Sequence, residues 1–493
     1  MKARLVVWGA ALVAAAAVTQ QTHALKGAVK DCSAEDDASD SPSNDVVARV
    51  KPAGQSVLES LYDEDVPVGN EMDREAQDEN GDVTPAPVSP PTPQEAAAPV
   101  AVAAASNNTD GFSVHALAIG GLGCWRWLML LQNNVAYLMS LSAERLKPQA
   151  VIGHGDNFYW NGVGRDDAAQ RFEDTFEAPY DQPSLQDVQW MNVMGNHDYG
   201  GAAYLCGEGD GKWRPCENAE EMYAALDERF SLQSKYVSPN GDRWKMPSHY
   251  YKMTLQDPQS GVVVEVYNVD TNAATNHGAE QVCCQCYGYQ GALKKGDPGY
   301  VDCNTVHRGH QLCFGGNTEL TDACLAKFKN WTDDSLAQLA RDTKESKADW
   351  KVVNSHYSPH YHMPEPMMQE WYKVLQEGGV QLFINGHTHA EGIDSSDFNV
   401  HFVTNGAGGG IQSEAMGDVP AHVQSVHKVW RAAGDPYGYF ELSFSKDTAR
   451  LQFVTFDETW KFAEKSADTV KGQGKIDYCY LVPKTGGAGK PCM

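Results

Sequence analysis

The feature that most constrains the fold is a repeated pattern, in which a short apolar run ends in glycine and polar residues. Seven such runs are predicted to be β-strands, over residues 114–120, 149–156, 188–198, 261–272, 350–360, 380–392 and 400–410. Two alternating runs, 437–445 and 448–457, predict a closing hairpin. Helices are predicted over 168–177, 333–346 and 365–379. Strands that alternate with helices are typical of layered α/β folds, in which ligands gather at the C-terminal ends of strands.

Four of the predicted strand ends carry side chains of the kinds that bind metal ions. They are Asp156 with Tyr159, Asn196 with His197, His356, and His387 with His389. A single cluster would be a weak signal, because a lone histidine is usually an ordinary surface or core residue. Four clusters in succession at strand ends predict a metal site. The two oxygens of Asp156 could bridge two cations, amide oxygen and imidazole suit Zn²⁺, Fe²⁺ or Mn²⁺, and a tyrosine phenolate favours Fe³⁺.

The sequences around these clusters resemble a known family. GDNFYWNGV, RFEDTFE, GNHDYGG and NGHTHAEG, in this order, are similar to the purple acid phosphatases of the calcineurin-like metallophosphoesterase superfamily. The resemblance covers roughly residues 112–460 and is best to the smaller type similar to tartrate-resistant acid phosphatase. It implies an α/β (α+β) fold, a four-layer sandwich of two mixed β-sheets flanked by helices, with the metal site at the C-terminal ends of strands.

The resemblance also implies a dinuclear metal centre, of Fe(III) plus Fe(II), Zn or Mn, with assigned ligands. Those for the trivalent iron are Tyr159, His389 and the bridging Asp156. Those for the divalent metal are Asp156, Asn196, His356 and His387. The catalytic histidines outside these sets are His197, which would contact phosphate, and either His360 or His362, which would protonate the leaving group.

One ligand of the family pattern is missing from this chain. The first predicted strand ends in Gly120-Gly121-Leu122-Gly123, and Gly121 stands where the family has an aspartate ligand to the trivalent iron. The loss of a charged ligand should weaken the binding of the first metal, the trivalent iron. Even changes to residues around the ligands reduce metal affinity by about 10–100-fold. Water or His154 could fill the gap, although an ordinary polar role is the preferred interpretation of His154. An aspartate at position 121 should restore the site if the metal is absent.

The ends of the chain have the composition of processed or unstructured segments. Residues 1–24 combine a basic start, an apolar core and a small-residue exit, which predicts a secretory signal peptide. The apolar run is too short for the alternative, a membrane anchor. Residues 25–110 are acidic and rich in Pro and Ala, which predicts a disordered leader. The metallophosphoesterase domain is predicted over 111–482 and a flexible tail over 483–493.

The chain contains twelve cysteines, and a secreted protein is expected to pair them as disulfides. Six of them crowd into a predicted loop-rich insertion at about 276–325. The CCQC string at 283–286 could suggest a zinc knuckle, but the chain has no partner CxxC, so disulfides are preferred. Asn107 and Asn330 lie in glycosylation sequons. The net charge of −26 excludes a nucleic-acid partner held through phosphates.

Together these features predict a secreted, extracellular, metal-dependent acid phosphatase. It would hydrolyse small phosphate monoesters by attack of metal-bound hydroxide, as a monomer without a stable membrane anchor. The first alternative is a catalytically impaired, metal-binding secreted module that acts through protein interaction, with the Cys-rich insertion as its binding surface. The second is a related phosphodiesterase, against which Tyr159 argues, because most diesterases of the superfamily lack that tyrosine.

Overall fold

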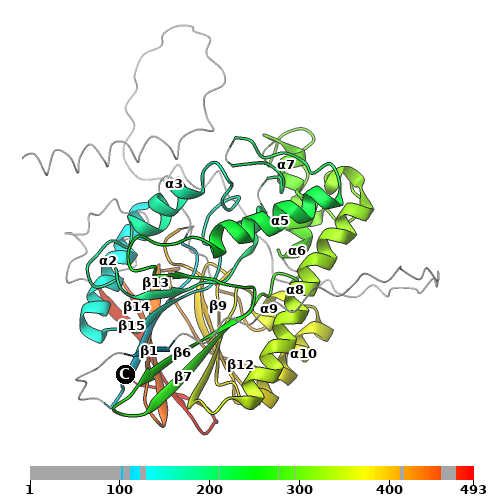
Figure 1. Cartoon of the computed structure of the whole chain (residues 1–493). Helices are drawn as coiled ribbons and strands as arrows, with labels where there is room; N and C mark the ends of the chain where they lie inside the picture. Colours follow the sequence, from blue (N-terminus) through cyan, green and yellow to red (C-terminus); the bar gives the residue numbers. More distant parts are fainter. Residues whose placement is uncertain are drawn as a thin grey trace, which may run out of the picture. The chain divides into compact units, whose positions relative to one another are not determined.

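Two mixed β-sheets of eight strands each form the centre of the protein (Figure 1). The computed structural model describes residues 101–103, 111–122, 129–201, 203–209, 211–275, 277–293, 295–410, 416–456 and 474–492. The first sheet has the order β1 (Ala101–Ala103), β6 (Tyr251–Asp257), β7 (Val262–Asn268), β8 (Trp350–Asn354), β9 (Leu382–Asn385), β11 (His401–Asn405), β10 (Glu391–Ser396) and β12 (Val426–Arg431). The second has the order β16 (Lys490–Pro491), β15 (Lys475–Pro483), β14 (Thr448–Thr455), β13 (Gly438–Phe444), β2 (Val114–Ile119), β3 (Ala150–Gly153), β4 (Gln189–Met191) and β5 (Trp244–Lys245).

Each sheet contains a parallel block formed by strands that the sequence predicts. In the second sheet β2, β3 and β4 are parallel, and in the first sheet β7, β8, β9 and β11 are parallel. The predicted closing hairpin is present as β13 and β14, which pair antiparallel. Because parallel strands end at the same edge of a sheet, the polar residues that follow these strands are brought to one edge of each sheet.

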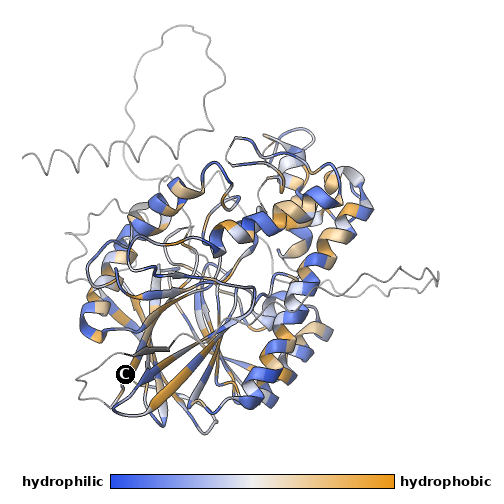
Figure 2. Cartoon of the chain, viewed as in Figure 1, coloured by the Kyte–Doolittle hydropathy of each residue, from blue (hydrophilic) through white to orange (hydrophobic). Residues whose placement is uncertain are grey.

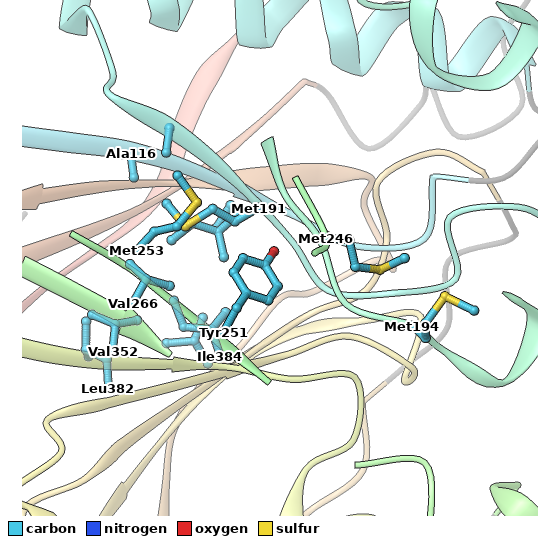
Figure 3. Close-up of a cluster of buried hydrophobic side chains, with 14 of the residues drawn as sticks. Ala116, Met191, Met194, Met246, Tyr251, Met253, Val266, Val352, Leu382 and Ile384 are labelled. Atoms are coloured by element: carbon cyan, nitrogen blue, oxygen red, sulfur yellow. The ribbon is translucent and has the colours of Figure 1, made fainter. Parts of the chain in front are cut away.

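The two sheets bury their facing surfaces against each other. Figure 3 shows Ala116 of β2 and Met191 of β4 near Met253 of β6, Val352 of β8 and Ile384 of β9. All five side chains are buried. Burial of a side chain the size of Met or Ile stabilises the fold by about 1.5–3 kcal/mol relative to exposure, so this layer is a main source of stability.

The outer faces of both sheets are covered by helices. Side chains alternate along a strand, so Leu117 of β2 points away from the facing sheet, into a cluster with Val135 and Met139 of α2. Val353 of β8 likewise packs with Trp371 of α10 on the outer face of the other sheet. Figure 2 shows hydrophobic and hydrophilic residues mixed along these outer helices. The predicted four-layer sandwich of two mixed sheets flanked by helices is therefore confirmed.

The helices are more numerous than the sequence predicts, and α8 is longer than its predicted range. Their bounds are α2 (Met129–Leu146), α3 (Ala168–Phe172), the π-helix η1 (Glu173–Glu177), α4 (Asn196–Tyr199), α5 (Ala219–Ser234), α6 (Ala279–Cys284), α7 (Cys286–Gln290), the 3₁₀ turns η2 (Cys303–Thr305) and η3 (Phe314–Gly316), α8 (Thr318–Glu345), α9 (Pro359–His362) and α10 (Glu365–Gly378). Helix α8 begins well before the predicted residue 333, because Asn317 caps it by accepting a hydrogen bond from Leu320 N–H (3.1 Å). No helix among the described residues is long and apolar enough to span a membrane.

Five disulfides connect the described cysteines, which confirms the disulfide prediction. The pairs are Cys206–Cys216, Cys283–Cys324, Cys284–Cys313, Cys286–Cys303 and Cys479–Cys492. All three cysteines of the CCQC string are paired, so none remains to bind zinc. The insertion at 276–325 is partly helical rather than only loop, since it holds α6, α7 and the start of α8.

The predicted boundaries of the domain differ from the structure at both ends. Strand β1 lies inside the predicted leader and pairs in parallel with β6. The predicted flexible tail, 483–493, contains β16, which pairs with β15, and the disulfide to Cys492 closes this end. The disulfide between Cys479 and Cys492 and the pairing of β16 with β15 hold the tail in place. Its Gly- and Lys-rich composition reveals neither. Residues 1–100, Asn107 and Cys124 lie outside the described residues.

Candidate metal centre

The predicted ligand residues lie just beyond the C-terminal ends of four parallel strands. Asp156 follows β3, Asn196 opens α4 after β4, His356 follows β8 and His387 follows β9. Asp156 and His387 adopt positive φ angles of 51° and 63°. Such a backbone conformation is uncommon for residues other than glycine, and it tends to occur at functional sites.

Four of these side chains converge on one small volume. Ligand atoms of Asp156, His356 and His387 all lie within 4.8 Å of one another. Asn196 Oδ1 lies 3.1 Å from His356 Nε2 and 3.1 Å from His387 Nδ1. The two imidazole nitrogens are themselves 3.2 Å apart. Three of these residues are buried and His387 is half-buried, so the group is shielded from solvent on most sides.

The protonation of this group fits a bound cation. The His356 Nδ1–H donates to the backbone carbonyl of His154 (2.7 Å), which leaves a lone pair on Nε2 toward Asn196 and His387. A carboxylate, an amide oxygen and two imidazole nitrogens then face one another with lone pairs. Lone pairs packed this closely repel unless a proton or a cation lies between them. We conclude that the donor set of Asp156, Asn196, His356 and His387 suits a divalent metal ion.

A second, smaller donor set adjoins the first through Asp156. The Tyr159 hydroxyl lies 3.0 Å from Asp156 Oδ2 and 3.4 Å from His389 Nε2. Tyr159 is buried and His389 is half-buried. These are the three residues that the resemblance assigns to the trivalent iron. The second set therefore offers three protein donors where the first offers four.

Gly121 lies beside this second set, and its surroundings leave little room for a side chain. Its φ is +66°, and a Cβ atom placed on it would be 3.7 Å from the Tyr159 hydroxyl and only 2.5 Å from the Gly406 carbonyl oxygen. The glycine-rich loop after β11 is also bonded to this turn, since Gly408 N–H donates to Gly120 O and Gly410 N–H to Gly121 O (both 2.9 Å). The backbone around Gly121 is thus fitted to glycine, which argues against simple restoration of the site by an aspartate.

His154 is not available as a replacement ligand. Its Nδ1 lies 2.6 Å from Asn354 Oδ1, and its Nε2 lies 3.1 Å from Asn405 Nδ2. Both ring nitrogens are therefore engaged by neighbouring strands. Burial, opposed by the hydrogen bond that His154 donates to Asn354, lowers the pKa of His154 to about 4. The preferred interpretation of His154 as an ordinary buried polar residue agrees with these contacts.

Two of the three predicted catalytic histidines lie at the centre, and the third does not. The backbone N–H of His197 donates to Asp156 Oδ1 (3.0 Å), and its ring lies 4.6 Å from that of Tyr159. The His362 ring lies 4.7 Å from that of His387. His360 instead lies 3.5 Å from Asp394 Oδ2, beside Phe402. His360 and His362 both lie on α9, and residues two positions apart on a helix point in different directions, so only the ring of His362 lies beside His387.

The pKa values of Asp156, His356 and His387 all lie below their ordinary values. Burial alone would raise the pKa of Asp156, but the charges of His356 and His197 outweigh it, so this pKa lies below its ordinary value. Burial lowers the pKa of His356, and burial together with the charges of His362 and His356 lowers that of His387 well below its ordinary value. A lowered pKa favours a neutral imidazole at His356 and His387 and an ionised carboxylate at Asp156, which are the forms that bind metal ions.

Asp198 is a part of the site that the sequence reasoning missed. Its carboxylate accepts hydrogen bonds from Gly195 N–H (2.8 Å), Asn157 N–H (3.0 Å), Phe158 N–H (3.1 Å) and Gln233 Nε2 (3.0 Å). It thereby ties the turn that carries Asp156 to the turn that carries Asn196. Burial and the charge of Asp156 raise the pKa of Asp198 to about 7. The sequence signal that could have identified Asp198 is its position in the GNHD string, two residues after the candidate ligand Asn196.

The chain is similar in sequence to purple acid phosphatases and tartrate-resistant acid phosphatases. The chain is 26% identical over 352 residues to purple acid phosphatase 17 of Arabidopsis thaliana, covering 70% of this chain and 81% of the relative. It is 23% identical to tartrate-resistant acid phosphatase type 5 of Sus scrofa, covering 71% and 80%. A solved structure described as GAP50, the anchor in the inner membrane complex of Plasmodium, aligns with a TM-score of 0.46 at 14% identity, covering 75% of this chain and 88% of that one.

A sequence profile supplies the family assignment. It spans residues 123–391, which is more than half of the chain and includes every predicted ligand. Homology to phosphatases and the ligand-rich strand ends together make this a metal-dependent phosphoesterase, and the family implies a dinuclear metal centre. The chain belongs to the calcineurin-like phosphoesterase family.

Proposed function

We propose that the protein is a secreted acid phosphatase that hydrolyses small phosphate monoesters, with a weakened site for the trivalent iron beside Gly121. The observation that supports this proposal best is the convergence of Asp156, Asn196, His356 and His387. Ligand atoms of Asp156, His356 and His387 all lie within 4.8 Å of one another. The nearby Tyr159 and His389, together with Asp156, offer the ferric iron of the resemblance a set of three donors. The divalent metal would be Fe(II), Zn or Mn.

The bound metals would stabilise charge on the phosphoryl oxygens and make a water molecule more acidic. The chain's own residues would position the substrate. His197 donates its Nδ1–H to the Trp160 carbonyl (2.9 Å), which fixes the ring and leaves Nε2 for the substrate. Asp156 holds the backbone N–H of His197 (3.0 Å), so the same carboxylate orients this histidine and belongs to both donor sets.

Of His360 and His362, His362 is better placed to contact the leaving group, as a hydrogen-bond donor to its oxygen. The Ser358 backbone N–H donates to His362 Nδ1 (3.1 Å), so a neutral His362 carries its proton on Nε2. That nitrogen lies 3.3 Å from Thr388 Oγ1, next to His387. His362 therefore presents a donor toward the loop that carries the candidate ligands, whereas His360 contacts Asp394.

A second function is favoured by the turn at Gly121. The close approach of Gly406 to this position leaves the second donor set without an acidic ligand there. A protein with one metal could be a catalytically impaired secreted module that acts through protein interaction, with the disulfide-linked insertion at 276–325 as its binding surface. This alternative predicts one metal per chain and little turnover.

The proposal includes the location and the processing of the chain. Residues 1–24 would be the signal peptide and 25–110 a leader before the catalytic domain. The five disulfides support an oxidising compartment. Asn330 is exposed on α8, where a glycan could be attached. A monomer is proposed.

The deciding experiment is to measure iron, zinc and manganese per chain in the secreted protein, with a visible spectrum of the same sample. Two metals, a tyrosinate-to-iron absorption band and hydrolysis of an aryl phosphate at acid pH would support the phosphatase. One metal, no band and no turnover would support the binding module. Preference for a bis-aryl phosphate over an aryl phosphate would instead indicate a phosphodiesterase.

A further inference from the structure

We propose that His277, at the start of the Cys-rich insertion, is a substrate-binding residue that donates a hydrogen bond to an oxygen of the phosphate ester on the His387 side of the centre. This inference rests on the proposed function and extends it. It assigns a role in substrate recognition to a segment that the sequence suggested only as a disulfide framework or a partner surface.

The position of His277 beside the candidate ligands is the first observation. Its ring centroid lies 6.2 Å from that of His387, with the two planes at 69°. His277 is exposed, whereas His362, whose ring also lies near that of His387, is buried. The charge of His277 is one of the causes that lower the pKa of His387 and of His362. His277 therefore stands between solvent and the group of imidazoles.

The second observation is that the backbone of this turn is held by the site itself. The Tyr357 hydroxyl, one residue after the candidate ligand His356, donates to the His277 carbonyl (3.0 Å). The Thr275 N–H donates to the His362 carbonyl (3.1 Å). His277 has a φ of +53°, an uncommon conformation outside glycine. These contacts hold the backbone at Thr275 and at His277 against residues of the site.

The third observation is the anchoring of the segment that follows. Helix α6 begins at Ala279, and the disulfide from Cys283 joins it to Cys324 in α8. A histidine on a free loop would pay a larger entropy cost to bind a ligand than one on a turn anchored in this way. The disulfides of the insertion thus help to hold a substrate contact in place.

The chemistry of imidazole suits a phosphate ester. A histidine offers at least one N–H donor in either charge state, so it can bind a phosphoryl or leaving-group oxygen. His197 and Trp160 flank the centre on the Tyr159 side, with rings 4.6 Å and 5.4 Å from that of Tyr159. His277 and His362 flank it on the His387 side. A substrate bound across the centre would then meet an imidazole at each end.

The test compares His277→Ala and His277→Gln with the control His307→Ala, in the metal-loaded, disulfide-intact protein. His307 is an exposed histidine of the same insertion that pairs with Glu280 (3.3 Å). Steady-state kinetics with aryl phosphates of different leaving-group pKa are measured together with inorganic phosphate binding by calorimetry. Metal content and Tm report whether each variant keeps its fold and its centre.

We expect His277→Ala to raise the KM for aryl phosphates and to weaken phosphate binding by about tenfold, the effect of one lost hydrogen bond to a charged group. The Gln variant should recover part of the loss because it retains an N–H donor. His307→Ala should match the wild-type protein. Unchanged KM and phosphate affinity in His277→Ala would overturn the inference.

The two proposals fail in distinguishable ways. Wild-type protein that binds phosphate but does not turn over aryl phosphates would overturn the phosphatase, while loss of phosphate binding in His277→Ala would still support the inference. Wild-type protein that neither turns over aryl phosphates nor binds phosphate would overturn both.

Discussion

Gly121 lies directly beside Tyr159, because a Cβ atom placed on Gly121 would be 3.7 Å from the tyrosine hydroxyl oxygen. A residue at this position would thus contact one of the three candidate ligands of the second donor set. The same Cβ would be 2.5 Å from the carbonyl oxygen of Gly406. Occupation of the second metal site therefore depends on what the glycine-rich loop after β11 allows at Gly121.

The variant Gly121→Asp is expected not to restore a full second site. It would have to adopt a φ of +66° and displace the Gly406 carbonyl, and the conformation alone costs about 1–2 kcal/mol. We expect a lower Tm and no gain in metal per chain, measured by thermal unfolding and elemental analysis. Gly121→Ala is the matched control and should lose a similar amount of stability. A second metal equivalent bound by Gly121→Asp would contradict this prediction.

Removal of a first-set donor is expected to remove the metal. His387→Ala deletes one of two imidazoles whose nitrogens lie 3.2 Å apart, so affinity should fall by at least the roughly 10–100-fold typical of changes around the ligands. The measurement is competition against a chelator, followed by phosphatase assay. His401→Ala, which removes a buried histidine of β11 outside the ligand set, is the control and should keep its metal.

Asp198→Asn is expected to loosen the centre without removing a ligand. The amide keeps the size of the carboxylate but has one acceptor oxygen in place of two, so some of the N–H donors from Gly195, Asn157 and Phe158 would lose their partner. We expect about 10–100-fold weaker metal binding in a folded protein. Wild-type metal affinity in this variant would show that the turns keep their positions without the carboxylate.

The buried ion pair of Arg243 and Glu177 is expected to be a major determinant of stability. The charges lie 2.8 Å apart, and both side chains are almost completely buried. Glu177→Ala would leave the guanidinium buried without its partner, which costs about 3–5 kcal/mol. Denaturant unfolding measures this loss. The exposed pair of Lys329 and Asp333 is the control, and Asp333→Ala should cost less than about 1 kcal/mol.

The same pair gives the protein an acid-dependent loss of stability. Burial would raise the pKa of Glu177, but hydrogen bonds from partners such as Asn240 and the charge of Arg243 outweigh it, so the pKa lies below its ordinary value. The stabilisation by ionised Glu177 is fully present above the pKa of about 4.3 that a glutamate has in the unfolded chain. It is lost as the pH falls through the lower pKa of Glu177 in the folded protein. In the Glu177→Gln variant the free energy of unfolding should depend less on pH in the acid range. The same dependence as in the wild-type protein would contradict the role of Glu177.

The disulfide between Cys283 and Cys324 is expected to stabilise the insertion. It joins α6 to α8 across a sequence separation of 41 residues, for which loop-closure entropy predicts roughly 4 kcal/mol. The double variant Cys283→Ala/Cys324→Ala should lower Tm and increase hydrogen exchange over α6. An exchange rate in α6 equal to that of the wild-type protein would show that packing alone holds the helix.

The residue pattern was sufficient to predict an α/β fold and the candidate ligands, while the family resemblance supplied the four-layer sandwich and the assignment of ligands to two metals. The ends of β3, β4, β8 and β9 carry Asp156, Asn196, His356 and His387, and the order of these residue types along the chain is enough to mark them as candidate ligands. Strand patterns are visible because both faces of these strands are buried, which requires nearly continuous apolar runs. Helices α2 and α5 escaped prediction because their polar and apolar residues do not form a clear helical stripe.

Tertiary structure decided what the local sequence could not. His360 and His362 are equivalent in the sequence, and only the direction of each side chain on α9 places one beside His387 and the other beside Asp394. Position 121 is a missing aspartate in the sequence, but the nearby Gly406 carbonyl, 285 residues further along the chain, determines what that position accepts. Residue types and their order are local properties, whereas side-chain direction and close approach between distant segments are set by packing.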